Sequence, residues 1–433
     1  MTSPDLSIHN TVPKLFWYNV ENYGNDITTW RKQKGVWDSI TWRDYGQWVK
    51  EIANALLDAG IQKGDKVSIL SQTRFEWVAV DLAIMSIGAV TAPVYHSNTE
   101  EQVHYIADHS ESKFIFVEDQ EQLDKILSIW NDLPDIKQVV VFEKYFPTDF
   151  PNVSRLDDFK KRGEIFGNNN SDQFFDRVNA GDPEDLISFI YTSGTTGHPK
   201  AGMINSYNVI SVIKHLQSLF DISREDMSLT YLPLAHIAER DLGHFVKLYT
   251  GYATVFAESL EDMPANLRQS GPTVMFGTPR VFEKFYARIS TGIKDATWIQ
   301  KTIYKWAVNV GKTYVEKKDK KQSISLIMKI KHSLAHFLIF QKIHDIFGGN
   351  IRFMISGAAP ISPNIIHFFH WIGLVIYEVY GMTETTGIIS SNRKGNVKIG
   401  SVGQIYPDTE VRIAEDGEIC CRSPQNIAGY YHN

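Results

Sequence analysis

Helix-like and strand-like patterns alternate through the first 145 residues, and this alternation limits the fold more than any other feature of the chain. Apolar residues recur at helical spacing from Trp48 to Leu57 and from Trp77 to Ile87. Short apolar runs beside these stretches predict strands at residues 67–70, 90–94, 114–117 and 139–142. Strands that alternate with helices pair in parallel, because a crossover helix returns the chain to the same end of the sheet. We therefore expect a doubly wound α/β fold.

A loop of glycines and hydroxyl side chains, YTSGTTGHPKAGM at residues 191–203, follows the apolar run Leu186 to Ile190. Gly194 and Gly197 allow backbone conformations that turn several amides toward one anion. Lys200 adds a mobile positive charge suited to a polyphosphate. The hydroxyl donors of the loop are Thr192, Ser193, Thr195 and Thr196. The loop predicts a phosphate site, although a turn-rich surface loop is the alternative that its composition also allows.

The spacing of this loop excludes a Walker A motif. That motif has four residues between its glycines and then Gly-Lys followed by Ser or Thr. Here two residues separate Gly194 from Gly197, and Lys200 follows Pro199. Any phosphate binding must therefore use a different loop geometry.

A segment of small residues, 356–360, follows the strand predicted at 352–355. Open α/β sheets bind ligands at the carboxyl ends of their strands. Gly357, Ala358 and Ala359 would let a flat base lie against the backbone, and a tight turn without a ligand is equally compatible with them.

The segment 380–385 follows another predicted strand, the apolar run 373–376, and combines an aromatic ring, hydroxyls and a carboxylate. Tyr380 could stack on adenine and Thr383 could donate to a phosphate. Glu384 could hold Mg²⁺ opposite the phosphates. A lone glutamate on a solvated surface is the competing interpretation.

Histidines give weaker signals. His236 ends the apolar run Tyr231 to Ala235, and an isolated histidine in such a setting is commonly structural. His367 and His370 lie one helical turn apart, without a cysteine or carboxylate at ligand spacing. We interpret that pair as helix packing and predict no zinc site there.

Composition sets broad limits. The 433 residues are 43% hydrophobic and 22% charged, as in ordinary globular proteins, and the length suggests two or three domains. The net charge of −6 argues against general nucleic-acid binding. No apolar run approaches the roughly 18 residues that span a bilayer, and the N-terminal residues lack a signal pattern. Adjacent Cys420 and Cys421 do not suit a structural disulfide, which predicts a cytoplasmic setting.

We expect two α/β subdomains, at residues 1–180 and 181–394, and the polar segment 146–184 is interpreted as the connection between them. A long helical insertion without strands is predicted near 293–347. Shorter patterns predict a truncated small β subdomain at 395–433. Its candidate strands are residues 397–402, 410–413 and 418–421.

The helical insertion is strongly basic. Residues 301–346 contain ten lysines and three acidic residues. Apolar residues mix with lysine and histidine at helical spacing from Ile324 to Phe347, which could make a helix that lies on a membrane surface. The alternative is a solvated helical hairpin packed on the core, since basic helix faces are common.

Taken together, the motifs resemble the adenylate-forming (AMP-binding) superfamily. The phosphate loop, SGAAP at 356–360, YGMTETTG at 380–387 and GSVGQIYP at 400–407 occur in the order typical of that superfamily. LPLAHIAER at 232–240 and FGTPRVFEKFY at 276–286 look most like long-chain fatty-acyl-CoA synthetases. The resemblance implies the large N-terminal domain of that fold. It also implies a two-step reaction, in which Mg-ATP converts a fatty acid to acyl-AMP and CoA then displaces AMP.

Roles follow from the resemblance, motif by motif. It implies that Thr192 to Lys200 hold the β- and γ-phosphates, with Glu384 and Thr192 near Mg²⁺. Tyr380 would stack on adenine and His236 would lie near the acyl entrance in a positional role. The remaining implied nucleotide contacts are Gly357, Ala358, Ala359, Gly381, Met382 and Thr383.

The chain departs from the family pattern at two places. Arg240 occupies the position where some long-chain members carry a tryptophan gate, so the resemblance does not support such a gate here. The family phrase at 428–433 normally precedes a ribose-binding aspartate, a hinge and a C-terminal domain with the adenylation lysine. We therefore expect a chain that lacks that domain and is poorly active alone. A fatty-acyl-AMP ligase and a nucleotide- or fatty-acid-binding module without turnover are the alternatives.

Overall fold

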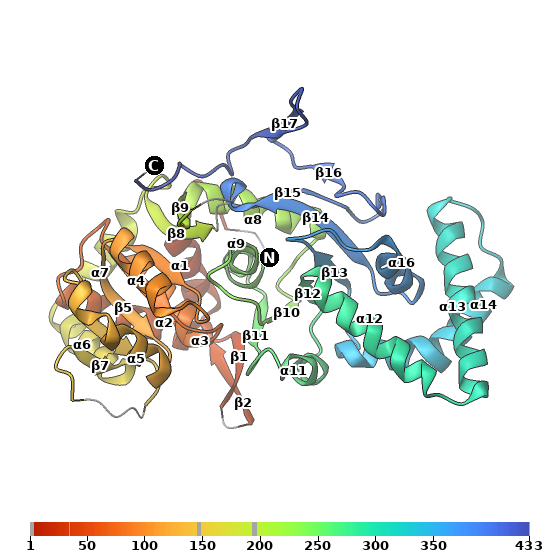
Figure 1. The fold of residues 1–433 in the computed structure, drawn as a ribbon, viewed down its shortest axis with the longest axis horizontal. Coiled ribbons are helices and arrows are strands. Elements are labelled where there is room, and N and C mark those ends of the chain that lie inside the picture. The colour runs from red at the N-terminus through yellow and green to blue at the C-terminus, as the bar shows by residue number, and fades with distance from the viewer. Residues whose placement is uncertain (1–3, 34, 145–148, 193–196, 433) are drawn as a thin grey trace.

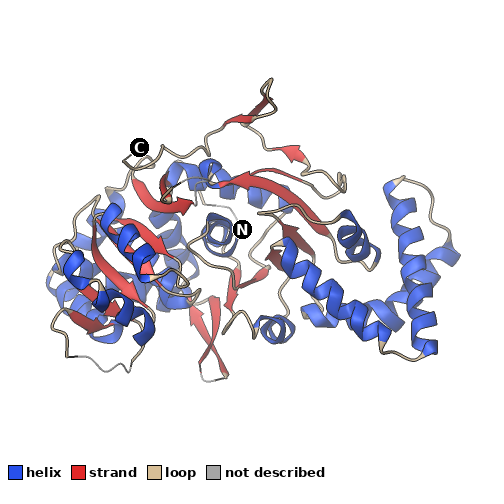
Figure 2. Ribbon diagram, in the orientation of Figure 1, coloured by secondary structure: helices blue, strands red, loops and turns tan. Residues whose placement is uncertain are grey.

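The computed structural model describes residues 4–33, 35–144, 149–192 and 197–432 (Figure 1). Strands of the described residues form two large sheets, with helices packed on both sides of each (Figure 2). The expected α/β fold with parallel strand pairing is confirmed. In the part of the chain that is described, no helix combines the length and apolarity needed to cross a membrane.

The first sheet is parallel except at one edge, where its last two strands pair antiparallel on either side of the phosphate loop. Phe114 and Phe116 face one core, and Ile115 and Val117 face another, as the alternation of side chains along a strand requires. In spatial order its strands are β7 (Val153–Arg155), β6 (Gln138–Val141), β5 (Ser112–Val117), β3 (Lys66–Leu70), β4 (Val90–Val94), β8 (Leu186–Thr192) and β9 (Lys200–Asn205).

Helices cover both faces of this sheet. One face packs against α1 (Val12–Tyr23), α2 (Trp42–Asp58), α3 (Phe75–Ser86), α6 (Leu156–Asn169) and α7 (Gln173–Asn179). The other packs against α4 (Glu100–His109) and α5 (Gln120–Ser128), which is followed by the short η1 (Trp130–Asp132). Thr99 and Gln102 form a capping box at the start of α4.

The second sheet brings distant parts of the sequence together. Its spatial order is β16 (Gln404–Ile405), β15 (Gly387–Ser391), β14 (Ile376–Met382), β13 (Phe353–Ser356), β12 (Val274–Gly277), β10 (Met227–Thr230), β11 (Ala253–Phe256), β1 (Ile27–Gln33) and β2 (Val36–Thr41). One face shares the core of the first sheet, together with α8 (Ser206–Phe220) and α10 (Val246–Thr250).

The opposite face of the second sheet has its own apolar core. It includes α11 (Met263–Ser270), α12 (Pro279–Lys294), α13 (Trp298–Asp319), α15 (Gln341–His344), η4 (Asp345–Phe347) and α16 (Pro363–Trp371). The helical character predicted for residues 293–347 is confirmed, and α13 pairs with α14 (Leu326–Ala335), which continues into the π-helical η3 (His336–Phe340). In Figure 1 these paired helices project from one end of the molecule.

The sheets do not follow the expected subdomain boundary along the sequence. β1 and β2 belong to the second sheet, whereas β8 and β9 belong to the first. The strands therefore cross the 180/181 boundary in both directions. That boundary stays a prediction, because sheet membership alone does not define a domain limit.

Three local predictions are wrong. The segment 146–184, interpreted as a connection, contains β7, α6 and α7 among its described residues. Gly163 lets α6 approach α2 closely, since a Cβ there would lie 1.8 Å from the Glu51 carbonyl oxygen.

The strand predicted at 373–376 begins instead at Ile376 and continues through Met382.

The third error concerns the strand predicted at 397–402, whereas the small β subdomain at 395–433 stays a prediction. Residues 397–402 form no strand, and the short β16 after them pairs with β15 of the second sheet. β17 (Glu410–Ile413) and β18 (Ile419–Arg422) form a separate antiparallel hairpin close to the predicted positions.

Candidate functional site

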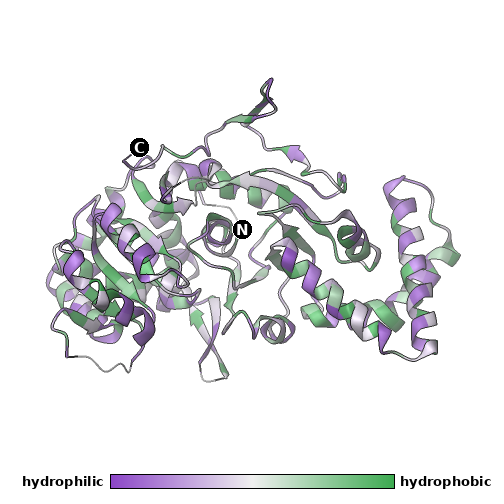
Figure 3. Cartoon of the chain, viewed as in Figure 1, coloured by the Kyte–Doolittle hydropathy of each residue, from purple (hydrophilic) through white to green (hydrophobic). Residues whose placement is uncertain are grey.

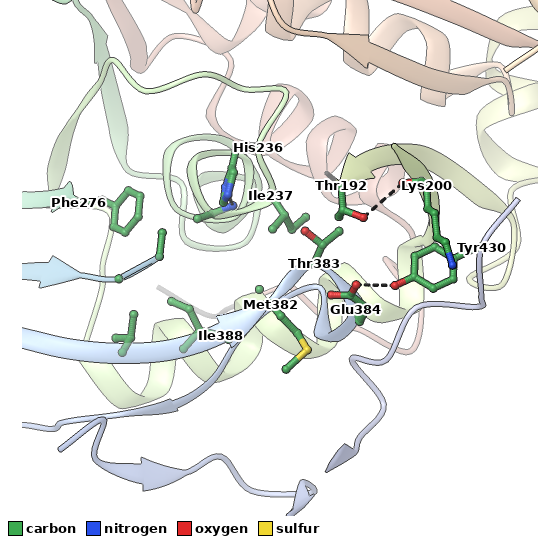
Figure 4. A pocket seen from close by; sticks show the side chains of 16 residues that line it. Thr192, Lys200, His236, Ile237, Phe276, Met382, Thr383, Glu384, Ile388 and Tyr430 are labelled. Carbon is green, nitrogen blue, oxygen red and sulfur yellow. Dashed lines mark hydrogen bonds between the residues drawn. The ribbon is translucent and has the colours of Figure 1, made fainter. Parts of the chain in front are cut away.

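A cavity of about 590 Å³ opens between the two sheets (Figure 4). Strand ends of both sheets contribute to its wall, as expected for an open α/β fold. The described residues that line it are Thr192, Lys200, His236, Ile237, Ala238, Phe276, Gly357, Ala358, Val379, Gly381, Met382, Thr383, Glu384, Gly387, Ile388 and Tyr430. Its size is that of a typical small-molecule site.

The two ends of the phosphate loop, Thr192 and Lys200, line this cavity from the first sheet. Thr192 ends β8 and Lys200 begins β9, and the Thr192 hydroxyl donates to the Lys200 carbonyl oxygen at 3.5 Å. Gly197 has a φ of +107°, a backbone conformation that suits glycine. Ser193, Gly194, Thr195 and Thr196 lie outside the described residues. The side chain of Lys200 is exposed and gives this wall a positive charge.

The segment of small residues forms part of the second wall. A Cβ at Gly357 would lie 2.7 Å from the Val379 side chain, so the close approach of β13 and β14 requires a glycine there. Ala358 adopts a left-handed conformation with a φ of +67°, which costs energy in a residue other than glycine. Ala359 and Tyr380 are not among the described residues that line the cavity.

The acidic corner of the cavity lies just after β14. Thr383, Glu384 and Thr385 form the short helix η5. The side chains of Thr383 and Glu384 line the cavity, as Figure 4 shows. β14 is irregular at Tyr380 and Gly381, where its register with β15 shifts. A Cβ at Gly381 would lie 1.9 Å from the carbonyl oxygen of Gly387, so no larger residue fits this crossing.

Tyr430 completes the acidic corner from the far end of the chain. Its hydroxyl donates to a carboxylate oxygen of Glu384, and its ring lies 5.3 Å from the Lys200 ammonium (Figure 4). Burial and the hydrogen bond to Glu384 together raise the pKa of Tyr430 to about 12. The hydroxyl therefore stays protonated and remains a donor at neutral pH.

The donor set of this corner fits Mg²⁺ bound to a polyphosphate. Magnesium at nucleotide sites usually takes one or two protein carboxylates and completes its shell with phosphates and water. Glu384 supplies one carboxylate and Thr192 one hydroxyl, and no cluster of three or more His, Cys, Asp or Glu side chains suited to a metal occurs among the described residues. The corner suits a metal that arrives with its nucleotide better than a resident metal.

His236 lies at another part of the wall, at the start of the short helix α9 (Ile237–Glu239). Its Nδ1 accepts a hydrogen bond from the Ala238 amide at 3.1 Å, which caps the helix and fixes the ring. Although the ring is exposed to the cavity, the surrounding protein removes enough water to lower the pKa of His236. The neutral, capped ring fits the positional role that the resemblance implies.

Behind His236, the chain places charged side chains in the interior. α9 continues into the π-helical η2 (Arg240–Phe245), and this helix lies between the two sheets (Figure 1). The Arg240 guanidinium pairs with Asp81 of α3 and also donates to Ser188 of β8. Burial alone would raise the pKa of Asp81, but Arg240 and His244 lower it below its usual range. Arg240 therefore links η2 to α3 and to β8 behind the cavity.

Sequence reasoning missed several residues of the site. Phe276, Val379 and Ile388 give one part of the cavity an apolar surface, and Tyr430 closes its acidic corner. Phe276, Val379 and Ile388 have the sequence pattern of ordinary strand residues, which does not mark them as part of a site. No local signal marks Tyr430, because its position depends on pairing between segments far apart in the sequence.

Comparisons with known proteins agree with this geometry. The sequence matches the family described as AMP-binding enzyme over residues 16–431. It is 29% identical over 427 residues to the long-chain-fatty-acid–CoA ligase FadD15 of Mycobacterium bovis, covering 98% of this chain and 69% of that protein. It is 28% identical over 443 residues to the long-chain-fatty-acid–CoA ligase ACSBG2 of Xenopus laevis, covering 99% of this chain and 58% of that protein.

Solved structures share the fold. The anthranilate CoA ligase AuaEII, in complex with anthranoyl-AMP, superposes with a TM-score of 0.73 at 18% identity, covering 100% of this chain and 73% of that one. A long-chain-fatty-acid–CoA ligase (FadD1) of Archaeoglobus fulgidus has the same TM-score at 15% identity, covering 100% of this chain and 77% of that one.

Proposed function

Because the chain belongs to the AMP-binding enzyme family, we propose that it binds ATP and activates a long-chain fatty acid for transfer to CoA. The relatives FadD15 and ACSBG2 are named long-chain-fatty-acid–CoA ligases, and this chain spans 69% and 58% of their lengths. In the first step the fatty carboxylate attacks the α-phosphorus of ATP and pyrophosphate leaves. In the second step the CoA thiol attacks the acyl carbon and AMP leaves.

One observation carries this proposal: the Lys200 cation and the Glu384 carboxylate line the same cavity from different sheets. Mg²⁺ bound at Glu384 would neutralise charge on the phosphates. Lys200 and Thr192 would hold the β- and γ-phosphates, and Thr383 would donate to the α-phosphate. Gly357 and Ala358 would lie against the base. Such fixed donors align the reacting groups and stabilise the charge that develops, without a covalent enzyme nucleophile.

The opposite part of the cavity supports an apolar acyl group. Phe276, Val379 and Ile388 line it, and in Figure 4 His236 and Ile237 lie between Phe276 and the phosphate-binding residues. A neutral, capped imidazole can orient the carboxylate end of the acyl substrate without removing a proton from it. We assign His236 this positional role.

Calorimetry with Mg-ATP and fatty-acid-dependent pyrophosphate exchange test the proposal on this chain. We expect binding of Mg-ATP, and a slow exchange that increases with acyl length into the long-chain range, since the chain alone is expected to be poorly active. Mass spectrometry of the products then separates acyl-CoA formation from a fatty-acyl-AMP ligase, which would stop at the adenylate. Absence of nucleotide binding would overturn the proposal. Nucleotide binding without exchange at any acyl length would favour a binding module.

We also propose that the projecting helices contact a membrane surface. Leu326, Ile327, Ile330, Leu334 and Phe337 recur at helical spacing along α14 and η3, and each is between 48% and 76% exposed. Figure 3 shows apolar and polar residues interspersed along these helices. An apolar stripe surrounded by lysines suits a bilayer that carries anionic lipids.

Co-sedimentation with vesicles tests the membrane contact. We expect tighter binding to anionic than to neutral phosphatidylcholine vesicles, and weaker binding as salt rises. Ile330→Glu, on the stripe, should reduce binding. Ile413→Glu, which changes an equally exposed isoleucine on the β17–β18 hairpin, should leave binding unchanged. Equal binding to both kinds of vesicle would contradict the proposal, and concentration-dependent dimerisation lost in Ile330→Glu would indicate a second copy of the chain instead.

A further inference from the structure

The segment 427–431 adds a short strand-like piece to the edge of β9. The Met203 amide donates to Gly429 at 2.9 Å, the Ala428 amide donates to Met203 at 3.0 Å, and the Tyr431 amide donates to Ala201 at 2.9 Å. β9 begins at Lys200, so this piece runs beside the lysine of the phosphate loop. Its backbone position is therefore set by the first sheet.

The same segment is also bonded to the second sheet. The Ile427 amide donates to the backbone oxygen of Glu384 at 3.0 Å, and three residues later the Tyr430 hydroxyl donates to the Glu384 carboxylate. The segment thus holds both the backbone and the side chain of one residue. Within the described residues it is one connection between the β9 edge, which begins at Lys200, and Glu384.

We propose that Tyr430 is a positioning residue, which orients the Glu384 carboxylate to receive Mg²⁺ carried by the nucleotide. The inference rests on the proposed function. It goes beyond that function because it assigns metal affinity to a side chain that touches neither the metal nor the phosphates.

The hydrogen-bond pattern of Glu384 supports this role. Within the described residues its Oε1 accepts the Tyr430 hydroxyl, and its Oε2 takes part in no side-chain hydrogen bond. A carboxylate has enough lone pairs to accept a hydrogen bond on one oxygen while the other binds a metal. The phenol is neutral, so it fixes the carboxylate without compensating the negative charge that attracts Mg²⁺. A lysine or arginine in its place would compete with the cation.

The ring of Tyr430 contacts Lys200, which lines the cavity from the first sheet. The Lys200 ammonium lies 5.3 Å from its centroid, within the range of a cation–π contact. A single side chain therefore contacts the expected phosphate-binding cation through its ring and the expected metal ligand through its hydroxyl. Removing the hydroxyl alone should affect the metal and spare the metal-independent contacts to phosphate.

Calorimetry of ATP binding, with Mg²⁺ and with EDTA, tests the inference. The readout is the factor by which Mg²⁺ strengthens ATP binding. In Tyr430→Phe we expect this factor to fall about tenfold or more, because the partners of metal-binding carboxylates typically contribute 10–100-fold in metal affinity. Affinity for ATP in EDTA should stay unchanged. Tyr431→Phe is the matched control, since it removes the neighbouring hydroxyl, which donates to Glu111 at 2.9 Å.

A double-substitution cycle separates orientation of Glu384 from a general structural effect. In a Glu384→Gln background, Tyr430→Phe should cause no further loss of the Mg²⁺ factor. An unchanged factor in Tyr430→Phe, an equal loss of ATP affinity with and without Mg²⁺, or tighter Mg-ATP binding would each overturn the inference. If the unsubstituted chain binds no ATP, the proposed function fails and the inference fails with it.

Discussion

Substitution of Glu239 tests whether the interior behind the cavity keeps a buried carboxyl group protonated. It ends α9, is 2% exposed and accepts a hydrogen bond from the Tyr231 amide at 3.2 Å. Among the described residues no cationic group forms an ion pair with it. Burial raises the pKa of Glu239 from an ordinary 4.5 to about 8, despite the opposing backbone hydrogen bonds. The native protein therefore keeps this side chain protonated at neutral pH.

The sign and size of the effect follow from proton linkage. Between pH 4.5 and pH 8 the native state holds a proton that the unfolded chain releases, so the free energy of unfolding falls as pH rises. The cost attributable to Glu239 is about 1 kcal/mol at pH 5 and about 3 kcal/mol at pH 7. Glu239→Gln removes the titration and keeps the shape and an accepting oxygen. The stability of this variant relative to the unsubstituted chain should rise by about 2.5 kcal/mol from pH 5 to pH 7.

Urea unfolding at pH 5, 6 and 7, followed by tryptophan fluorescence, measures this difference. Any constant effect of the substitution on packing cancels, because only the change between pH values is used. Glu283→Gln is the matched control, since it makes the same chemical change at a glutamate that lies exposed on α12. Parallel pH profiles for Glu239→Gln and the unsubstituted chain would refute the reasoning, as would a relative stability that falls with rising pH.

The other predictions concern the buried ion pair, a tight turn and the metal corner. Asp81→Asn leaves the Arg240 guanidinium buried without its counter-ion and should lower the free energy of unfolding by about 3–5 kcal/mol in urea; a loss below 1 kcal/mol would contradict this. Gly403→Ala should lower the melting temperature much more than Gly417→Ala, because both glycines have positive φ but only at Gly403 would a Cβ meet backbone, at 2.0 Å. Glu384→Gln should slow fatty-acid-dependent pyrophosphate release by about 10²–10³-fold without changing the melting temperature, and a rate within threefold would count against its role.

Much of the fold could be predicted because the relevant signals are local. The strands at 67–70 and 90–94 lie within one residue of β3 and β4, since alternation of apolar runs with helices marks them directly. β1 could not be found in this way. Its sequence, ITTWRKQ, mixes polar and apolar residues, and its place in the second sheet depends on parallel pairing with β11.

The same distinction between local signals and long-range pairing applies to the residues of the candidate site. Thr192, Lys200, Glu384 and the small residues that follow β13 line one cavity, and their meeting was predictable because each lies at a strand end. Tyr430 could not be placed, because nothing in its neighbourhood specifies pairing with β9. Lys247 is a similar case in the interior. Its ammonium donates to the Thr28 carbonyl and to two threonine hydroxyls, all at 2.7 Å, and these partners come from two strands distant in sequence.

The parallel pairing of β1 with β11 has a consequence for biosynthesis. Thr29 pairs with Thr254, so during translation the β1–β2 hairpin leaves the ribosome long before its neighbour in the second sheet exists. The first sheet differs, because each of its strands made after β3 pairs with a strand that has already been made. The second sheet cannot form in the order of synthesis, and its unpaired strand edge invites association with other chains. Folding of the second sheet should therefore be slow and governed by long-range contacts.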